Sequence, residues 1–206
     1  MEILHKDWLE IKSDGGRLMF GYDQEWYSTE YKRKRGCGPT SATMLFLYIM
    51  RRDSLQLPFA TDSVSDIKEA LEFVWDFVTP TPMGLYSLKS YCHGMEELFK
   101  HFKLVYKCEG LNVSLLRSTR PTLAETIAFI EQGLSLDSPV AFVNLDRGKE
   151  TALEGWHWIT VVGLHYDENS DKYIATCYDD GDLVKFDVRL WLETTKMGGA
   201  FAYMTV

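Results

Sequence analysis

The stretch GCGPTSATMLFLYIM, residues 36–50, sets a cysteine between two glycines directly ahead of an apolar segment. Pro39 suits the first turn of a helix because its ring presets φ and it has no N–H to lose. We therefore predict a buried helix from Pro39 to Arg52. Gly36 and Gly38 would let the backbone turn sharply and leave room beside the Cys37 thiol. The positive end of a helix favours a thiolate, so Cys37 is a candidate nucleophile. An unreactive cysteine in a tight turn is the alternative.

The composition is that of an ordinary globular chain. Of its 206 residues, 46% are hydrophobic and 25% are charged, which suits one domain or two small lobes that share a cleft. The formal net charge of −8 argues against a general affinity for nucleic acid or anionic membrane. No apolar run approaches the roughly 20 residues of a membrane-spanning helix. We expect neither nucleic acid nor membrane as a partner.

The cysteines indicate a reducing compartment. Cys37, Cys92, Cys108 and Cys177 are scattered and form no CxxC pair. The N-terminal residues MEILHKDWLEIKSDGG lack the basic start and unbroken apolar stretch of a secretory signal. We therefore expect reduced thiols and a cytoplasmic location. No zinc-ligand spacing is present, and we predict no metal or organic cofactor.

Three more helices are expected before the last third of the chain. The spacing of apolar residues predicts helices over residues 65–78 and about 85–102. Thr122 followed by Glu125 is a capping-box pattern, and Gly133 is the expected end of a helix over LAETIAFIEQ.

The last third is rich in β-branched and aromatic residues, which favour strands. Short turns such as DENSD and DDGD separate these segments, so we predict an antiparallel sheet. The fold class is α+β, as a single domain of residues 1–206. Residues of about 1–135 form a mainly helical lobe, residues of about 136–206 form a β lobe, and the site lies in the groove between them. The predicted strands are PVAFVNL, HWITVVGLHY, KYIATCY, DLVKFDV and GAFAYMTV.

A thiol nucleophile needs a base, and His157 is the candidate among five histidines. It opens the most apolar strand, GWHWITVVGL, between Trp156 and Trp158, and by alternation it points to a different side from both. A base is usually oriented by an acid. Asp179 ends the next strand and would lie close to His157 in an antiparallel pair, with Asp180 as the neighbouring alternative.

Donors for an oxyanion complete the expected set. The Cys37 backbone N–H is one, and the side-chain amide of Gln24, in GYDQEWYS, is a second candidate. Gly36, Trp156 and Trp158 are candidates for the lining of a substrate groove.

Taken together, these segments resemble the papain-like cysteine peptidases, and most closely the C39-like branch. The resemblance rests on the glutamine in GYDQEW, on CGPTSATM at a helix head, on PVAFVN, on HWITVVGLHYD and on an acidic residue one strand later. It extends from about residue 20 to the C-terminus.

The resemblance implies a papain-like fold and a thiol-dependent hydrolase of peptide or amide bonds. It assigns Cys37 as nucleophile, His157 as base and acid, Asp179 as orienting residue and Gln24 as oxyanion donor. Two features depart from the family pattern. Gln24 precedes the cysteine by an unusually long interval, and Asp180 replaces the usual proline after the orienting acid.

Two other functions stay open at this point. The same three residues would serve an acyltransferase of the transglutaminase-like or arylamine acetyltransferase-like kind, or the fold would serve as a binding module without turnover. The basic run 31–35, YKRKR, precedes the cysteine directly and is either a solvated loop or an electropositive rim that selects acidic substrates.

Overall fold

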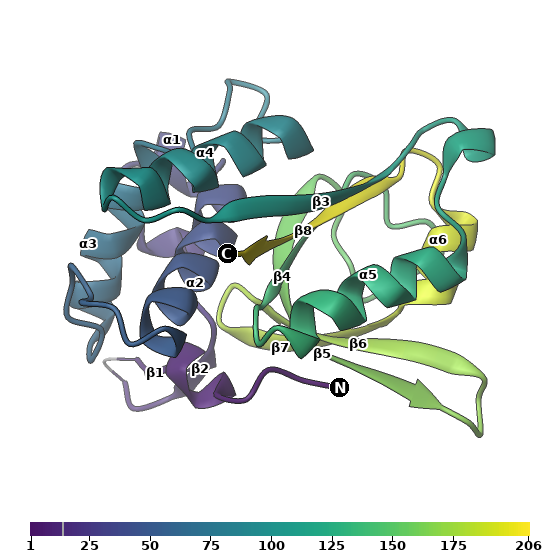
Figure 1. Cartoon of the computed structure of the whole chain (residues 1–206), viewed down its shortest axis with the longest axis horizontal. Helices are drawn as coiled ribbons and strands as arrows, with labels where there is room; N and C mark the ends of the chain where they lie inside the picture. The colour runs from purple at the N-terminus through teal and green to yellow at the C-terminus, as the bar shows by residue number, and fades with distance from the viewer. Residues whose placement is uncertain (14) are drawn as a thin grey trace.

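The structure is a computed structural model that describes residues 1–13 and 15–206. It is an α+β protein, as predicted, in which helices pack on both faces of a large antiparallel sheet (Figure 1). The α-helices are α1 (Glu30–Arg33), α2 (Cys37–Arg52), α3 (Val64–Trp75), α4 (Leu88–His101), α5 (Leu123–Ser135) and α6 (Val188–Thr194). Short 3₁₀ helices are η1 (Lys6–Leu9), η2 (Gln24–Trp26) and η3 (Arg117–Thr119).

The main sheet has six strands in the order β3-β8-β4-β5-β6-β7, and every neighbouring pair is antiparallel. The five strands predicted from the last third of the chain are confirmed as β4 (Val140–Asn144), β5 (His157–Asp167), β6 (Lys172–Asp179), β7 (Asp182–Asp187) and β8 (Gly199–Thr205). The sixth, β3 (Lys107–Val113), was not predicted, because its charged and glycine-containing sequence KCEGLNV lacks a strand pattern. A separate two-stranded sheet joins β1 (Glu10–Lys12) to β2 (Leu18–Phe20).

Helix α2 is the central helix of the molecule. Every residue from Gly38 to Met50 is buried, so the helix is covered on all sides rather than on one face. It begins at Cys37, two residues earlier than predicted, because the backbone at Gly36 is already in the helical region, with φ −79° and ψ −11°. Cys37 is therefore the first residue of the helix itself.

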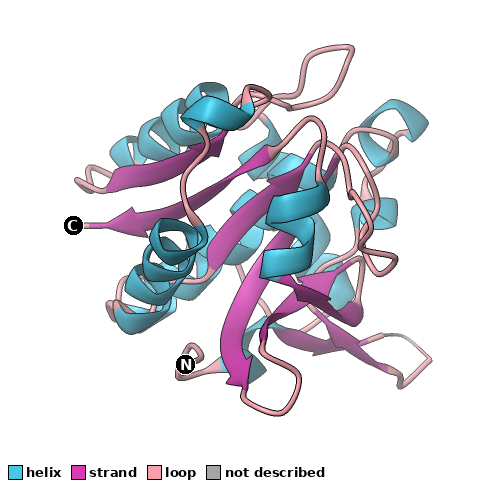
Figure 2. Ribbon diagram, turned by 90° about the vertical axis from the view of Figure 1, so that its right-hand side faces the viewer, coloured by secondary structure: helices cyan, strands magenta, loops and turns pink. Residues whose placement is uncertain are grey.

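Helices lie on both sides of the sheet in Figure 2, and α2 and α5 cover opposite faces of it. The Ser41 hydroxyl of α2 lies 2.9 Å from that of Thr160 on β5. Gly133 of α5 packs instead on Val140, which pairs with Val161, the next residue of β5. Because neighbouring strand residues point to opposite faces, the two helices lie on different sides.

The predicted helix end at Gly133 is wrong, since α5 continues to Ser135. The glycine serves close packing instead. A Cβ at Gly133 would lie 2.6 Å from Val140 Cγ2 and 3.0 Å from the Tyr203 ring. The capping box of Thr122 and Glu125 at the other end of the helix is present as predicted.

A β-bulge lies in β5 where it pairs with β6. The register runs from Val161 opposite Cys177 directly to Gly163 opposite Thr176, so Val162 is the extra residue. The N-terminal segment contacts this bulge, because the Ile3 N–H donates to the Val162 carbonyl at 3.1 Å. The bulge sets which residues near the end of β6 share a face with the start of β5.

The division of the chain near residue 135 stays a prediction, since β3 and α5 precede that point and both pack on strands of the later part. Among the described residues, no helix combines the length and the apolar character needed to cross a bilayer.

Candidate active site

Cys37 is half-buried and occupies the first position of α2. The first N–H groups of a helix have no acceptor within the helix, so the Cys37 N–H is available to a ligand. The flanking glycines permit close packing rather than an unusual turn. A Cβ on Gly36 would lie 2.5 Å from Tyr27 Cε2, and one on Gly38 would lie 2.8 Å from Leu85 Cδ2.

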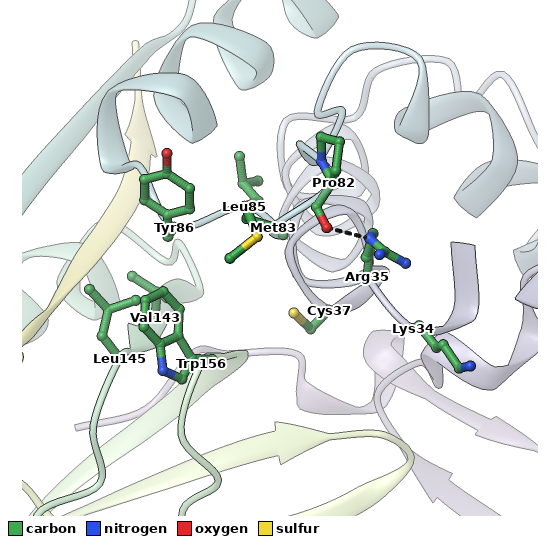
Figure 3. A pocket seen from close by; sticks show the side chains of 11 residues that line it. Lys34, Arg35, Cys37, Pro82, Met83, Leu85, Tyr86, Val143, Leu145 and Trp156 are labelled. Carbon is green, nitrogen blue, oxygen red and sulfur yellow. Dashed lines mark hydrogen bonds between the residues drawn. The ribbon is translucent and has the colours of Figure 1, made fainter. Parts of the chain in front are cut away.

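The Cys37 side chain lies in a cavity of about 370 Å³, and in Figure 3 its sulfur points into the space between Met83 and Trp156. One wall is the segment of residues 82–86. The other is formed by Val143 and Leu145 at the C-terminal end of β4 and by Trp156, the residue before β5. Its lining residues are Lys34, Arg35, Cys37, Pro82, Met83, Gly84, Leu85, Tyr86, Val143, Leu145 and Trp156.

His157 is the first residue of β5 and is only 8% exposed. Its Nε2 lies 2.6 Å from Asp179 Oδ1, at the end of β6. Because Nε2 is engaged in this way, Nδ1 is the ring nitrogen that remains for the Cys37 sulfur. The structure thus joins His157 and Asp179 from two neighbouring strands, and the Cys37 thiol at the head of α2 is near enough to affect the pKa of His157.

The surroundings of His157 favour its charged form. Burial lowers the pKa of the imidazole, but hydrogen bonding with Asp179 and with Cys37 outweighs burial and raises that pKa to about 11. The negative charges of the same two partners act in the same direction. These contacts therefore favour the imidazolium form of His157.

Asp180 has a different relation to the imidazole. Its Oδ2 lies 3.9 Å from His157 Nε2, and its Oδ1 accepts the Gln24 N–H at 3.2 Å. The backbone of Asp180 adopts φ +45°, a conformation uncommon for residues other than glycine. Burial, followed by the nearby charge of Asp179, raises the pKa of the Asp180 carboxyl to about 6 despite the opposing effect of His157.

Gln24 is the first residue of η2, and its backbone N–H donates a hydrogen bond to the Asp180 carboxylate. Within the described residues, its side-chain Oε1 is buried and has no hydrogen-bond partner. Gln24 does not line the cavity that contains Cys37. The structure therefore brings Gln24 to the acidic side of the candidate site, and its role as oxyanion donor stays a prediction.

The three candidates for the groove lining differ. Trp156 lines the cavity, is 55% exposed and has φ +61°, which is an outlier for a bulky residue. Trp158 is buried and lies outside the lining, because its indole N–H donates to the Leu85 carbonyl at 2.5 Å and its ring stacks on Tyr91. Gly36 is also buried and lies beneath the Tyr27 ring. Trp158 and Gly36 are therefore not among the lining residues of this cavity, and their place in a substrate groove stays a prediction.

Sequence reasoning missed the wall formed by residues 82–86. This segment contains a tight turn in which Thr81 and Gly84 are paired, and Gly84 has φ +92°. The sequence PTPMG at residues 80–84 signals such a turn, but no pattern indicates what the turn packs against. Its position follows from long-range contacts, including the Trp158 bond to Leu85.

One group of side chains has the composition of a metal site. His157, Asp179 and Asp180 offer ligand atoms that all lie within 4.8 Å of one another. Imidazole and carboxylate groups are ordinary ligands of divalent cations. The same three groups also form a hydrogen-bonded acid–imidazole pair with a second acid nearby.

The comparison with solved structures shows the fold. The chain is similar to the crystal structure of UfSP from C. elegans, with a TM-score of 0.52 and 9% sequence identity over 96% of this chain. It spans 34% of that chain, so the likeness concerns one part of the larger protein. This likeness shows a papain-like fold, as predicted. No family model and no curated protein matches the sequence.

Proposed function

We propose that this chain is a cysteine-type peptidase or amidohydrolase of the C39-like kind, which cleaves a peptide or amide bond through a thioester acyl-enzyme. The observation that carries the proposal is the proximity of the Cys37 thiol to the hydrogen-bonded pair of His157 and Asp179. Cys37 lies at the head of α2 and lines the cavity. His157 Nε2, at the start of β5, lies 2.6 Å from Asp179 Oδ1, at the end of β6. A nucleophile, a base and a group that orients the base are the parts such a reaction requires.

In the proposed reaction, the Cys37 thiolate attacks the carbonyl carbon and forms a tetrahedral intermediate. His157, as imidazolium, donates its proton to the leaving amine as the carbon–nitrogen bond breaks, which leaves a thioester on Cys37. Neutral His157 then removes a proton from water, which attacks the thioester and releases the acid. The raised pKa of His157 supports its role as the proton donor to the leaving amine. Asp179 holds the ring orientation throughout.

The proposed oxyanion donors are the Cys37 N–H and the Gln24 side-chain amide. The free N–H at the head of α2 and the buried Gln24 side chain beside Asp180 support this assignment. Loss of one oxyanion donor typically lowers kcat by about 10²–10³-fold. We expect Gln24→Ala to lower kcat by about 10²-fold, with an unchanged rate of Cys37 alkylation by iodoacetamide. An unchanged kcat would assign the second donor to another group.

The proposed function is tested with a synthetic library of short unstructured peptides, whose products are read by mass spectrometry. We expect the wild-type chain to cleave peptides and Cys37→Ala to cleave none. A parallel reaction with an added primary amine distinguishes hydrolysis, which yields only free carboxylates, from acyl transfer, which yields new amides. Absence of cleavage and of amide formation, combined with ordinary Cys37 reactivity, would favour the binding module.

A further inference from the structure

The cavity beside Cys37 has a chemical asymmetry that the proposed reaction does not explain. In the view of Figure 3, the Cys37 sulfur lies between Arg35 on one side and Trp156, Val143 and Leu145 on the other. One end of the cavity is therefore apolar and aromatic, and the other carries positive charge. No acidic residue is among the lining residues, although the whole chain has a formal net charge of −8.

Three of the four basic residues in the run before Cys37 have a carboxylate within 4.0 Å. Lys32 pairs with Glu72 at 2.5 Å, and Lys34 pairs with Glu30 at 2.5 Å. Arg33 lies 3.8 Å from Glu25 and also donates to the Tyr27 carbonyl. Within residues 1–13 and 15–206, Arg35 alone of the four has no carboxylate within 4.0 Å.

Arg35 is also held in place before any ligand arrives. Its Nε donates to the Pro82 carbonyl at 2.9 Å, which ties the guanidinium to the wall formed by residues 82–86. Its guanidinium lies 4.4 Å from the centre of the Tyr31 ring, a cation–π contact. These contacts use Nε and one face of the group, and they leave both Nη atoms for a planar acceptor.

We infer that Arg35 binds a carboxylate of the substrate next to the bond that Cys37 attacks, while Trp156, Val143 and Leu145 receive an apolar side chain on the other side of the sulfur. The substrate class is therefore an acidic peptide segment, with Glu or Asp near one side of the scissile bond and an apolar residue near the other. A preorganised guanidinium favours a carboxylate because it forms two parallel charge-assisted hydrogen bonds. This inference rests on the proposed function.

The experiment compares Arg35→Gln with Lys34→Gln as a matched control. Each removes one positive charge from the same cavity rim, but Lys34 is already paired with Glu30. Gln at position 35 also keeps an N–H group for the Pro82 carbonyl. With the peptide library, we expect wild-type cleavage sites to be enriched in Glu or Asp at one position. We expect Arg35→Gln to lower that preference by about 5- to 10-fold, Arg35→Lys to retain part of it, and Lys34→Gln to leave it unchanged.

A second measurement needs no turnover. The ratio of the Cys37 alkylation rate with iodoacetate to that with iodoacetamide reports attraction of a carboxylate to the thiol. We expect Arg35→Gln to lower this ratio and Lys34→Gln to preserve it. Cleavage without an acidic preference, or a preference that persists in Arg35→Gln, would overturn this inference and leave the proposed function intact. Absence of cleavage by the wild-type chain would overturn both.

Discussion

The head of α2 and the paired ends of β5 and β6 supply the two halves of the candidate site, and different kinds of contact fix them. Cys37 is positioned mainly by residues close to it in the sequence. Gly36 leaves room for the Tyr27 ring to pack against the backbone, and the helix begins at Cys37 itself. His157 and Asp179 are 22 residues apart and meet only through strand pairing. The helical half thus depends on local sterics, and the strand half depends on register.

The bulge at Val162 decides which acid faces His157. With the observed register, Thr160 lies opposite Tyr178, so Asp179 shares its face with Ile159 and His157. Without the extra residue, the register would shift by one and Asp180 would take that face instead. The backbone of Asp180 is in the left-handed region, and its Oδ2 lies 3.9 Å from His157 Nε2.

The largest expected effect comes from removing His157, the proposed base, from the strand half. His157→Ala should lower kcat/KM by about 10³-fold or more, because both the base and the counter-ion of the thiolate are lost. It should also slow iodoacetamide labelling of Cys37 at pH 6, where a thiol with an ordinary pKa of about 8.5 is less than roughly one percent thiolate. Labelling is measured for each cysteine by peptide mapping.

Two other cysteines serve as internal controls for that experiment. Hydrogen bonding with Cys92 and burial raise the pKa of the Cys108 thiol, and burial raises that of Cys177. Both should label slowly at pH 6 in the wild-type chain and in His157→Ala. Equal labelling of Cys37 in the two proteins would contradict a thiolate–imidazolium pair.

The next largest effect separates the two acids. Asp179→Ala should lower kcat/KM by about 10²-fold, less than His157→Ala, because in the proposed reaction Asp179 orients the base and does not transfer the proton itself. Asp180→Ala should lower kcat/KM much less, since its contact with the ring is long. Steady-state kinetics on one cleaved peptide measure both. A larger loss in Asp180→Ala would show that the acids exchange roles in solution.

The helical half was the more predictable from sequence. The pattern GCGPT followed by apolar residues predicts a cysteine at a helix start, and the structure differs only by beginning α2 two residues earlier. The five late strands follow from composition, but β3 does not, because its pairing with β8 is decided by position in the fold. The choice between Asp179 and Asp180 depends on the bulge, which was not predicted from the sequence, although a glycine inside a strand such as Gly163 often marks one.

A substitution in the helical half tests local sterics. Gly36→Ala should lower the free energy of unfolding by about 1–3 kcal/mol, because the new Cβ would lie 2.5 Å from Tyr27 Cε2 and 2.9 Å from the Lys32 carbonyl. Chemical denaturation measures the change. Gly15→Ala is the matched control, since the nearest atom to its Cβ within 4 Å is Ser13 Oγ at 3.9 Å. Equal stability of the two variants would mean that the Tyr27 ring can move aside.

The smallest expected effect is a pH-dependent one at Asp180. Its folded-state pKa of about 6 lies above the unfolded value of about 3.9, so the folded chain holds the proton more tightly. Stability should therefore fall as the pH rises from about 4 to about 6, and the loss should persist at higher pH. Asp180→Asn removes this ionisation while its side-chain oxygen can still accept the Gln24 N–H. We expect the variant to match the wild-type chain at pH 4 and to exceed its free energy of unfolding at pH 7 by about 1 kcal/mol or less, because solvent screens a partly exposed group. Denaturation curves at the two pH values measure the difference, and a variant that is less stable at pH 7 would show that the charge of Asp180 on His157 outweighs its burial.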